Sequence, residues 1–128
     1  MAPTGSVVAI VDDDHRVLES LQDLLEAAGY TVRLFSSAAT LLETGDLSGI
    51  DCVISDIGMP VVDGFELQRR VMGVRPGLPV ILVTGRHEIQ ADDRAAISGY
   101  KTFFRKPFDG QELLTAVSDA LRTSGGNR

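Results

Sequence analysis

The chain has 128 residues, 44% of them hydrophobic and 23% charged, which suits a single globular domain and argues against disorder. Its formal net charge of −6 argues against direct contact with nucleic acid, and its one cysteine excludes an internal disulfide framework or a zinc ribbon. The sequence has neither an apolar run long enough to cross a membrane nor the basic start of a signal peptide, so we expect a cytoplasmic protein without membrane contact.

The first half of the chain alternates short β-branched runs with helical patterns. Residues 7–11 are all apolar and predict a strand that is buried on both faces. Apolar residues at i, i+3, i+4 and i+7 over 17–28, followed by Gly29, predict a helix. The next three elements are a strand over 31–35, a short helix over 37–43 and a strand over 52–54. Cys52 lies in this last apolar run, and we expect it to be a buried structural thiol.

The same alternation continues in the second half. The pattern predicts a helix over 65–72, a strand over 80–83, an alanine-rich helix over 89–98, a strand over 102–104 and a helix over 111–121. Five strands that alternate with helices predict an α/β fold with a doubly wound parallel sheet and helices on both faces. We expect a flexible start over 1–5, one domain over 6–122, and a polar tail or the start of a linker over 123–128.

Polar side chains follow successive strands of this predicted sheet. Asp12 and Asp13 come after the first strand, Asp56 after the third, Thr84 at the end of the fourth, and Lys106 after the fifth. The carboxyl ends of parallel strands line one crevice, so these groups are expected to converge. Three carboxylates repel one another unless a hard cation such as Mg²⁺, or Mn²⁺, joins them. A carboxylate, a hydroxyl and a lysine beside such a cation are also the groups that accept and hold a phosphoryl group.

Each of these residues taken alone has a simpler interpretation. One acid in the run from Asp12 to Asp14 is enough to cap the following helix, and for Asp14 we prefer that role. Asp56 alone fits the start of a turn, and Thr84 alone is unremarkable. The prediction of a site therefore depends on five residues that occur together at successive strand ends.

Four segments carry a resemblance to a known family. They are residues 10–14 (IVDDD), 55–60 (SDIGMP) with 63–64 (DG), 83–85 (VTG) and 104–108 (FRKPF). In this order and spacing the sequence resembles the receiver domain of a bacterial two-component response regulator over about residues 7–121. It is most similar to receivers of transcription factors with a LuxR-type output, of the nitrogen-fixation class. The resemblance implies a flavodoxin-like five-stranded sheet of order 2-1-3-4-5.

The resemblance also implies roles for the acidic residues. Asp56 matches the phosphoacceptor, and it matches a metal ligand as well. Asp13 matches the direct Mg²⁺ ligand, Asp12 matches the acid that reaches the metal through water, and Gly58 matches the residue whose backbone carbonyl completes the site. Gly58 has no side chain, so at this position nothing shields the phosphoryl group.

The remaining implied roles concern the response to phosphorylation. Thr84 matches the switch hydroxyl, Lys106 the lysine that pairs with the phosphoryl group, and Phe103 the switch aromatic. The bond before Pro107 is expected to be cis. Arg86 is a candidate for tuning the lifetime of the phosphoryl group, although an exposed arginine on a solvated loop is an equally good interpretation.

The function that the resemblance implies is a signalling switch rather than an enzyme, although the domain assists its own phosphorylation and dephosphorylation. A sensor histidine kinase, or a phosphotransfer protein, is the expected donor to Asp56. The face formed by residues 89–98, the last strand and the last helix then changes shape and acts on an output domain or an effector protein, which we expect to control transcription. The resemblance also implies a homodimer that forms on phosphorylation. We expect this domain to make no direct contact with DNA.

Two other functions compete with this one. A Mg²⁺-dependent phosphohydrolase of the haloacid-dehalogenase type also uses an aspartate nucleophile, a Thr or Ser and a lysine. Arg16 stands where that signature has a small Thr or Val, and the chain is short for its cap and later acidic pair. A flavin carrier fits worse, because the three acids after the first strand would repel the cofactor phosphate.

Overall fold

A computed structural model describes residues 5–43, 47–58, 62–84, 103–105 and 109–126. Its elements are β1 (Val7–Val11), α1 (His15–Ala27), β2 (Thr31–Phe35), α2 (Ala38–Glu43), β3 (Cys52–Asp56), α3 (Gly64–Val74), β4 (Val80–Thr84), β5 (Phe103–Arg105) and α5 (Gly110–Gly126). Every predicted element that falls in the described residues is present, within a few residues at its ends. The helix predicted over 89–98 lies outside them.

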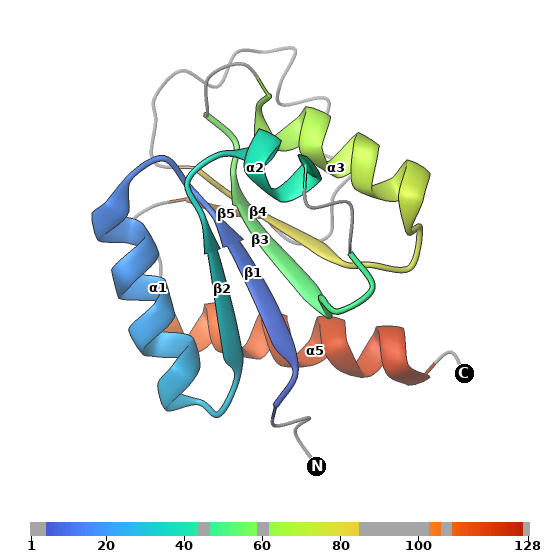
Figure 1. Ribbon diagram of the computed structural model, residues 1–128. Helices are drawn as coiled ribbons and strands as arrows, with labels where there is room; N and C mark the ends of the chain where they lie inside the picture. The colour runs from blue at the N-terminus through green and yellow to red at the C-terminus, as the bar shows by residue number, and fades with distance from the viewer. Residues whose placement is uncertain (1–4, 44–46, 59–61, 85–102, 106–108, 127–128) are drawn as a thin grey trace.

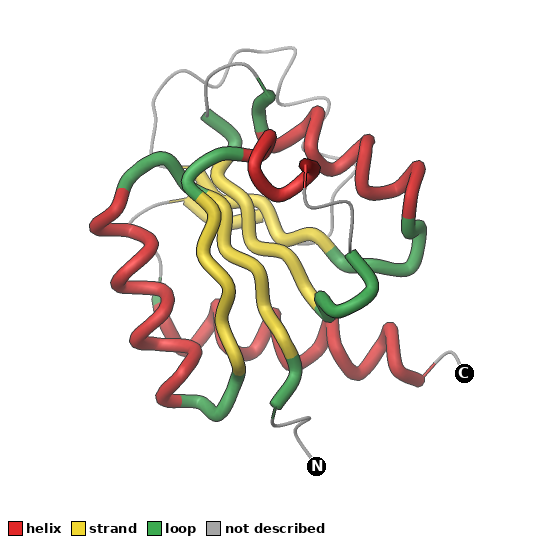
Figure 2. The backbone as a smooth tube through the Cα atoms, viewed as in Figure 1, coloured by secondary structure: helices red, strands yellow, loops and turns green. Residues whose placement is uncertain are grey.

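The five strands form one parallel sheet in the order β2-β1-β3-β4-β5, as the resemblance implied. Helices α1 and α5 lie on one face and α2 and α3 on the other, so the molecule has three layers (Figure 1). The tube view shows how α1 returns the chain from the end of β1 to the start of β2, and α3 from the end of β3 to the start of β4 (Figure 2). The predicted doubly wound fold is confirmed.

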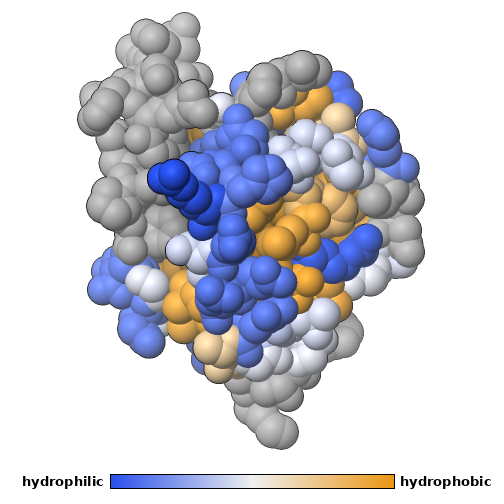
Figure 3. Space-filling model, turned by 60° about the vertical axis from the view of Figure 1, so that its left-hand side comes forward, coloured by the Kyte–Doolittle hydropathy of each residue, from blue (hydrophilic) through white to orange (hydrophobic). Residues whose placement is uncertain are grey.

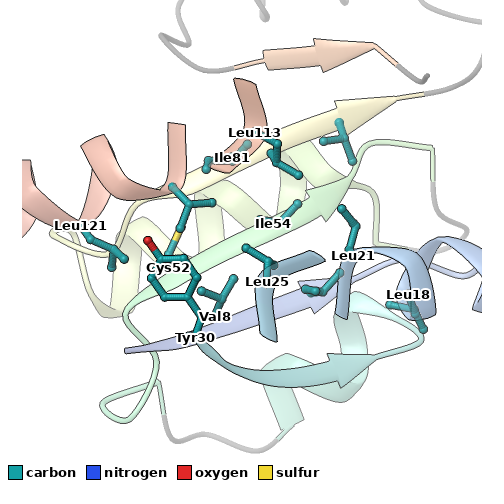
Figure 4. Close-up of a cluster of buried hydrophobic side chains, with 13 residues drawn as sticks. Val8, Leu18, Leu21, Leu25, Tyr30, Cys52, Ile54, Ile81, Leu113 and Leu121 are labelled. Carbon is teal, nitrogen blue, oxygen red and sulfur yellow. The ribbon is translucent and has the colours of Figure 1, made fainter. Parts of the chain in front are cut away.

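The central strands are buried on both faces because their apolar side chains alternate between two cores. In β1, Val8 and Ile10 pack into the cluster under α1 and α5, whereas Ala9 and Val11 pack into the cluster under α2 and α3. Figure 4 shows the first cluster, with side chains from the sheet meeting those of both helices. This burial explains why the sequence of β1 is an unbroken apolar run.

The end of α1 is set by the glycine that the sequence predicted as its stop. Gly29 has a φ of 98°, a left-handed conformation that an L side chain rarely adopts. The N–H of Gly29 donates to the carbonyl of Glu26 at 3.0 Å, and the N–H of Tyr30 donates to the carbonyl of Leu25 at 3.1 Å. This pair of bonds is a Schellman motif, and the buried side chains of Leu25 and Tyr30 belong to one cluster beside it.

Two elements extend beyond their predicted ends, for the same reason. Helix α5 continues to Gly126 rather than ending at Leu121, and β3 continues through Asp56 rather than ending at Ile54. Hydropathy marks only apolar residues, while backbone hydrogen bonds also form between polar residues. As a result Asp56 is the last residue of β3, paired with Val83, and not part of the following turn.

Three of the five residues of the edge strand β2 are exposed. Leu34 is 38% exposed, and the guanidinium of Arg33 lies 5.3 Å from the ring centroid of Phe35. Figure 3 brings this side of the molecule forward and shows an apolar band among largely polar side chains. Among the described residues, no helix combines the length and the apolar character that crossing a membrane requires.

Candidate functional site

The structure brings three of the predicted site residues together. Asp12 directly follows β1, Asp13 is next to it, and Asp56 ends the neighbouring strand β3. The parallel register pairs Val11 with Ser55, so both strands end at the same edge of the sheet. One carboxylate oxygen from each aspartate lies within 4.8 Å of the other two.

The three carboxylates differ sharply in exposure. Asp12 is 1% and Asp56 is 2% exposed, whereas Asp13 is exposed to solvent. Like charges about 4 Å apart repel by about 4 kcal/mol at an effective dielectric near 20. A divalent cation offsets such repulsion, and oxygen-only ligands are the set that hard cations such as Mg²⁺ prefer. The acidic cluster therefore fits a divalent metal site that is open on the side of Asp13.

The run of three acids divides into two roles. The side chain of Asp14 accepts a hydrogen bond from the N–H of Arg16 at 2.9 Å and is the N-cap of α1, as predicted. The N–H of Asp14 in turn donates to Oδ1 of Asp12 at 2.9 Å. This bond orients the Asp12 carboxylate at the edge of the sheet, beside Asp56, and leaves Asp14 to the helix.

The end of β3 is held by backbone bonds around Asp56. The N–H of Ile57 donates to the carbonyl of Val83 at 2.9 Å, so the ladder with β4 persists one residue past the strand. The buried hydroxyl of Ser55 donates to the carbonyl of Asp56 at 3.0 Å. Ser55 has no predicted role in the site, although a lone hydroxyl in a fully buried apolar strand is a signal for one. Gly58 follows, half-buried, two residues after Asp56.

Helix α3 begins directly against this segment. Asp63 caps the helix by accepting a hydrogen bond from the N–H of Glu66 at 2.8 Å. The N–H of Gly64 donates to the carbonyl of Ile57 at 3.0 Å. In the sequence, this Asp-Gly pair is one of the segments that resemble the family, but the sequence alone assigns the glycine no structural role.

The other predicted site residues lie at the edge of what the structure describes. Thr84 is the last residue of β4 and Phe103 the first of β5, on strands that pair with each other. Only the backbone of these two residues is described. Arg86, Lys106 and Pro107 lie outside the described residues, so their predicted roles, including the cis bond, stay predictions.

The cysteine of β3 lies at the opposite end of the strand from Asp56. Burial, and secondly the charge of Asp51, raise the pKa of the Cys52 thiol to about 12. Cys52 packs beside Tyr30 in the apolar cluster under α1 and α5 (Figure 4). The expectation of a buried structural thiol is confirmed.

Comparison with known proteins agrees with this geometry. The family model described as "Response regulator receiver domain" matches residues 8–118. The response regulator protein TodT of Pseudomonas putida is 36% identical over 128 residues, which are 100% of this chain and 56% of TodT. The transcriptional regulatory protein FixJ of Bradyrhizobium diazoefficiens is 32% identical over 119 residues, 93% of this chain and 58% of FixJ. The chain thus spans about half the length of these curated relatives.

A solved structure gives the same result for the fold. The CheY-like response regulator receiver domain protein of Methanospirillum hungatei superimposes with a TM-score of 0.86 at 26% identity, over 98% of this chain and 100% of that one. Receiver domains are signalling switches of two-component systems. By its sequence, its sheet order and its acidic cluster, the chain belongs to the family of response regulator receiver domains.

Proposed function

We propose that this receiver accepts a phosphoryl group on Asp56 in the presence of Mg²⁺ or Mn²⁺, with a sensor histidine kinase or a phosphotransfer protein as the donor. One observation carries the proposal: three aspartates with oxygens within 4.8 Å of one another, of which Asp56 is buried at the end of a central strand. Membership of the receiver family favours this function over the phosphohydrolase and the flavin carrier.

The donor set suits the cation. In this proposal Asp13, Asp56 and the carbonyl of Gly58 bind it directly, and Asp12 reaches it through water. When bound, the cation supplies positive charge that offsets the three carboxylates and the incoming phosphoryl group. Asp12 is already oriented by the N–H of Asp14, so little side-chain freedom is lost there on binding.

The transfer itself is a displacement at phosphorus. A carboxylate oxygen of Asp56 forms a bond to phosphorus while the phosphorus–nitrogen bond of the donor histidine breaks, and the imidazole keeps the electron pair. The product is an acyl phosphate at the carboxyl end of β3. Because Asp56 ends a strand that is hydrogen-bonded on both sides, its backbone is fixed before the donor arrives.

The response is proposed to pass through the neighbouring strands. Thr84, at the end of β4, and Lys106 bind the new phosphoryl oxygens, and Phe103 changes its rotamer. Residues 89–98, β5 and α5 then present a changed face to an output domain or an effector, and two phosphorylated copies pair. A transcriptional output is supported by the length of the relatives, which is about twice that of this chain, and by the description of FixJ as a transcriptional regulatory protein.

The test uses a small acyl phosphate as donor, with Mg²⁺, and intact-protein mass spectrometry as the measurement. We expect one phosphoryl group per chain in the wild-type protein and none in Asp56→Asn. Omission of the divalent cation, with a chelator present, is expected to abolish the adduct. Multiple turnover on phosphate esters, or an adduct that survives Asp56→Asn, would instead support the phosphohydrolase or another acceptor.

A further inference from the structure

The first turn of α3 approaches the backbone of β3 more closely than any side chain would allow. A Cβ placed on Gly64 would lie 2.7 Å from the carbonyl oxygen of Asp56 and 2.9 Å from Cα of Ile57. Both atoms belong to the backbone, so neither can rotate away as the end of a flexible side chain would. Glycine is therefore required here for space, so that one backbone can pass close to another.

Two further contacts hold this turn in place. The N–H of Gly64 donates to the carbonyl of Ile57 at 3.0 Å. The next residue, Phe65, packs with Ile57 and Leu82 in a small buried cluster of its own, separate from the two main cores. The start of α3 is thus fixed to the residue that follows Asp56 by a steric contact, a hydrogen bond and apolar packing.

The segment held in this way contains the reacting group of the proposed function. Asp56 supplies the acceptor carboxylate, and Gly58, two residues later, supplies a proposed metal-binding carbonyl. Mg²⁺ requires near-octahedral oxygens at about 2.0–2.1 Å, so a displacement of a few tenths of an ångström in this backbone weakens binding. The clash is confined to the start of α3, because a Cβ on Gly73, in the last turn, would meet nothing within 4 Å.

We propose that Gly64 is a positioning residue: by allowing the first turn of α3 to rest on the Asp56–Ile57 backbone, it sets where the Asp56 carboxylate and the Gly58 carbonyl lie. This inference rests on the proposed function of Asp56. It assigns the Asp-Gly pair a physical role in the site, beyond the capping of a helix by Asp63.

The experiment compares Gly64→Ala with Gly73→Ala, the same substitution in the same helix. The measurements are the dissociation constant for Mg²⁺ by calorimetry and the rate of phosphorylation by a small acyl phosphate. Gly64→Ala is expected to weaken Mg²⁺ binding about tenfold and to slow phosphorylation by a similar factor, in the range seen when groups that orient metal ligands are removed. Gly73→Ala is expected to match the wild type in both.

A loss of stability alone must not be mistaken for a loss of positioning. Val71→Ala, in the core beneath α3, provides a destabilised control that is expected to keep the Mg²⁺ affinity of the folded protein. If Gly64→Ala fails to fold, Phe65→Leu loosens the same contact without a clash and is expected to weaken Mg²⁺ binding by about two- to fivefold, less than the loss of the glycine itself.

The possible results separate the two claims. Wild-type affinity for Mg²⁺ and a wild-type rate in Gly64→Ala, or in Phe65→Leu where that variant is the one that folds, would show that Gly64 serves only folding. An equal loss of affinity in Val71→Ala would overturn the inference as well. If the wild-type chain neither binds Mg²⁺ nor accepts a phosphoryl group, the proposed function itself fails, and this inference fails with it.

Discussion

The two ends of β3 each bury a side chain capable of nucleophilic chemistry, and they do so in opposite surroundings. Cys52, at the start of the strand, is 0% exposed and packs among apolar side chains. Asp56, at the end of the strand, is 2% exposed and lies beside Asp12 and Asp13. Both residues are within one strand of five residues, with the same neighbours β1 and β4 on either side.

The contrast shows that burial alone does not make a functional residue. Around Cys52 the surroundings disfavour the charged form, which raises the pKa of the thiol to about 12 and leaves it unreactive at neutral pH. Around Asp56 lie two more carboxylates, one of them open to solvent, so this end of the strand fits a divalent cation. The first arrangement adds an apolar group to the core, whereas the second presents oxygen atoms that suit a divalent cation.

The largest expected effect comes from neutralising one acid of the cluster. Asp13→Asn is expected to weaken Mg²⁺ binding by more than about 100-fold, because it removes a proposed direct ligand. Without metal, the same variant is expected to be more stable than the wild type, because it removes one of three neighbouring negative charges. The gain is limited to about 1 kcal/mol because Asp13 is exposed and water screens part of the repulsion. Calorimetry with Mg²⁺ and urea unfolding in a chelator measure the two effects.

A weaker affinity for Mg²⁺ together with a higher stability without metal distinguishes a metal-binding site from a cluster of acids that stabilises the fold. Glu19→Gln, an exposed acid within α1, is the matched control and is expected to change neither quantity beyond about 0.5 kcal/mol. An Asp13→Asn variant that binds Mg²⁺ as the wild type does, or that is less stable without metal, would contradict the account.

The Cys52 thiol is expected to affect the pH dependence of the free energy of unfolding only at alkaline pH. The pKa of Cys52 is raised from 9.0 to about 12 in the folded protein, so above pH 9 the unfolded chain loses this proton while the folded protein keeps it. Stability from this group is complete below about pH 9 and falls by about 1.4 kcal/mol per pH unit up to about pH 12. Cys52→Ala is expected to remove this slope, measured by urea unfolding between pH 8.5 and about 10.5. Identical slopes in both proteins would show that the thiol ionises freely in the folded state.

A smaller effect tests whether the two ends of the strand act independently. Gly29→Ala forces a side chain into a left-handed conformation next to the cluster that holds Cys52. The expected loss of stability is about 1–2 kcal/mol, measured by urea unfolding. The dissociation constant of the folded protein for Mg²⁺ should not change, and a change of severalfold would mean that the two ends are coupled.

The smallest expected change in stability comes from substituting an exposed residue of α3. Glu66 accepts hydrogen bonds from Arg69 and Arg70, which lower the pKa of its exposed carboxyl. The resulting stabilisation is present above the unfolded pKa and is lost as pH falls through the lowered value. Glu66→Gln is therefore expected to be slightly less stable than the wild type at pH 7, and this difference is expected to disappear as the pH falls below the lowered pKa, by thermal unfolding. A difference that persists in acid would point to a cause other than charge.

Much of the fold could be predicted because the side chains that pack into its cores must be apolar, and their spacing along the chain is visible in the sequence. The apolar run of β1 and the stripe of α1 follow directly from packing against two cores, and Gly29 marks the helix end because of its left-handed backbone. The approach of Asp12 and Asp13 to Asp56 also followed from the sequence, since parallel strands end at one edge. The cap at Asp14 followed from helix chemistry alone.

Other features depend on contacts between segments that no local pattern contains. The last residue of β3 is fixed by its pairing with β4, which hydropathy does not show. The need for glycine at position 64 arises from the Asp56–Ile57 backbone, seven or eight positions earlier in the chain. The hydrogen bond from Ser55 to the carbonyl of Asp56 likewise becomes visible only once the strand is built.

The most direct test of the central claim is to locate the phosphoryl group. After reaction with a small acyl phosphate and Mg²⁺, borohydride reduces an aspartyl phosphate to homoserine, which peptide mass spectrometry assigns to a position. We expect homoserine at position 56 and at no other aspartate. Homoserine at Asp12 or Asp13, or a phosphoryl group that survives reduction on a hydroxyl, would contradict it.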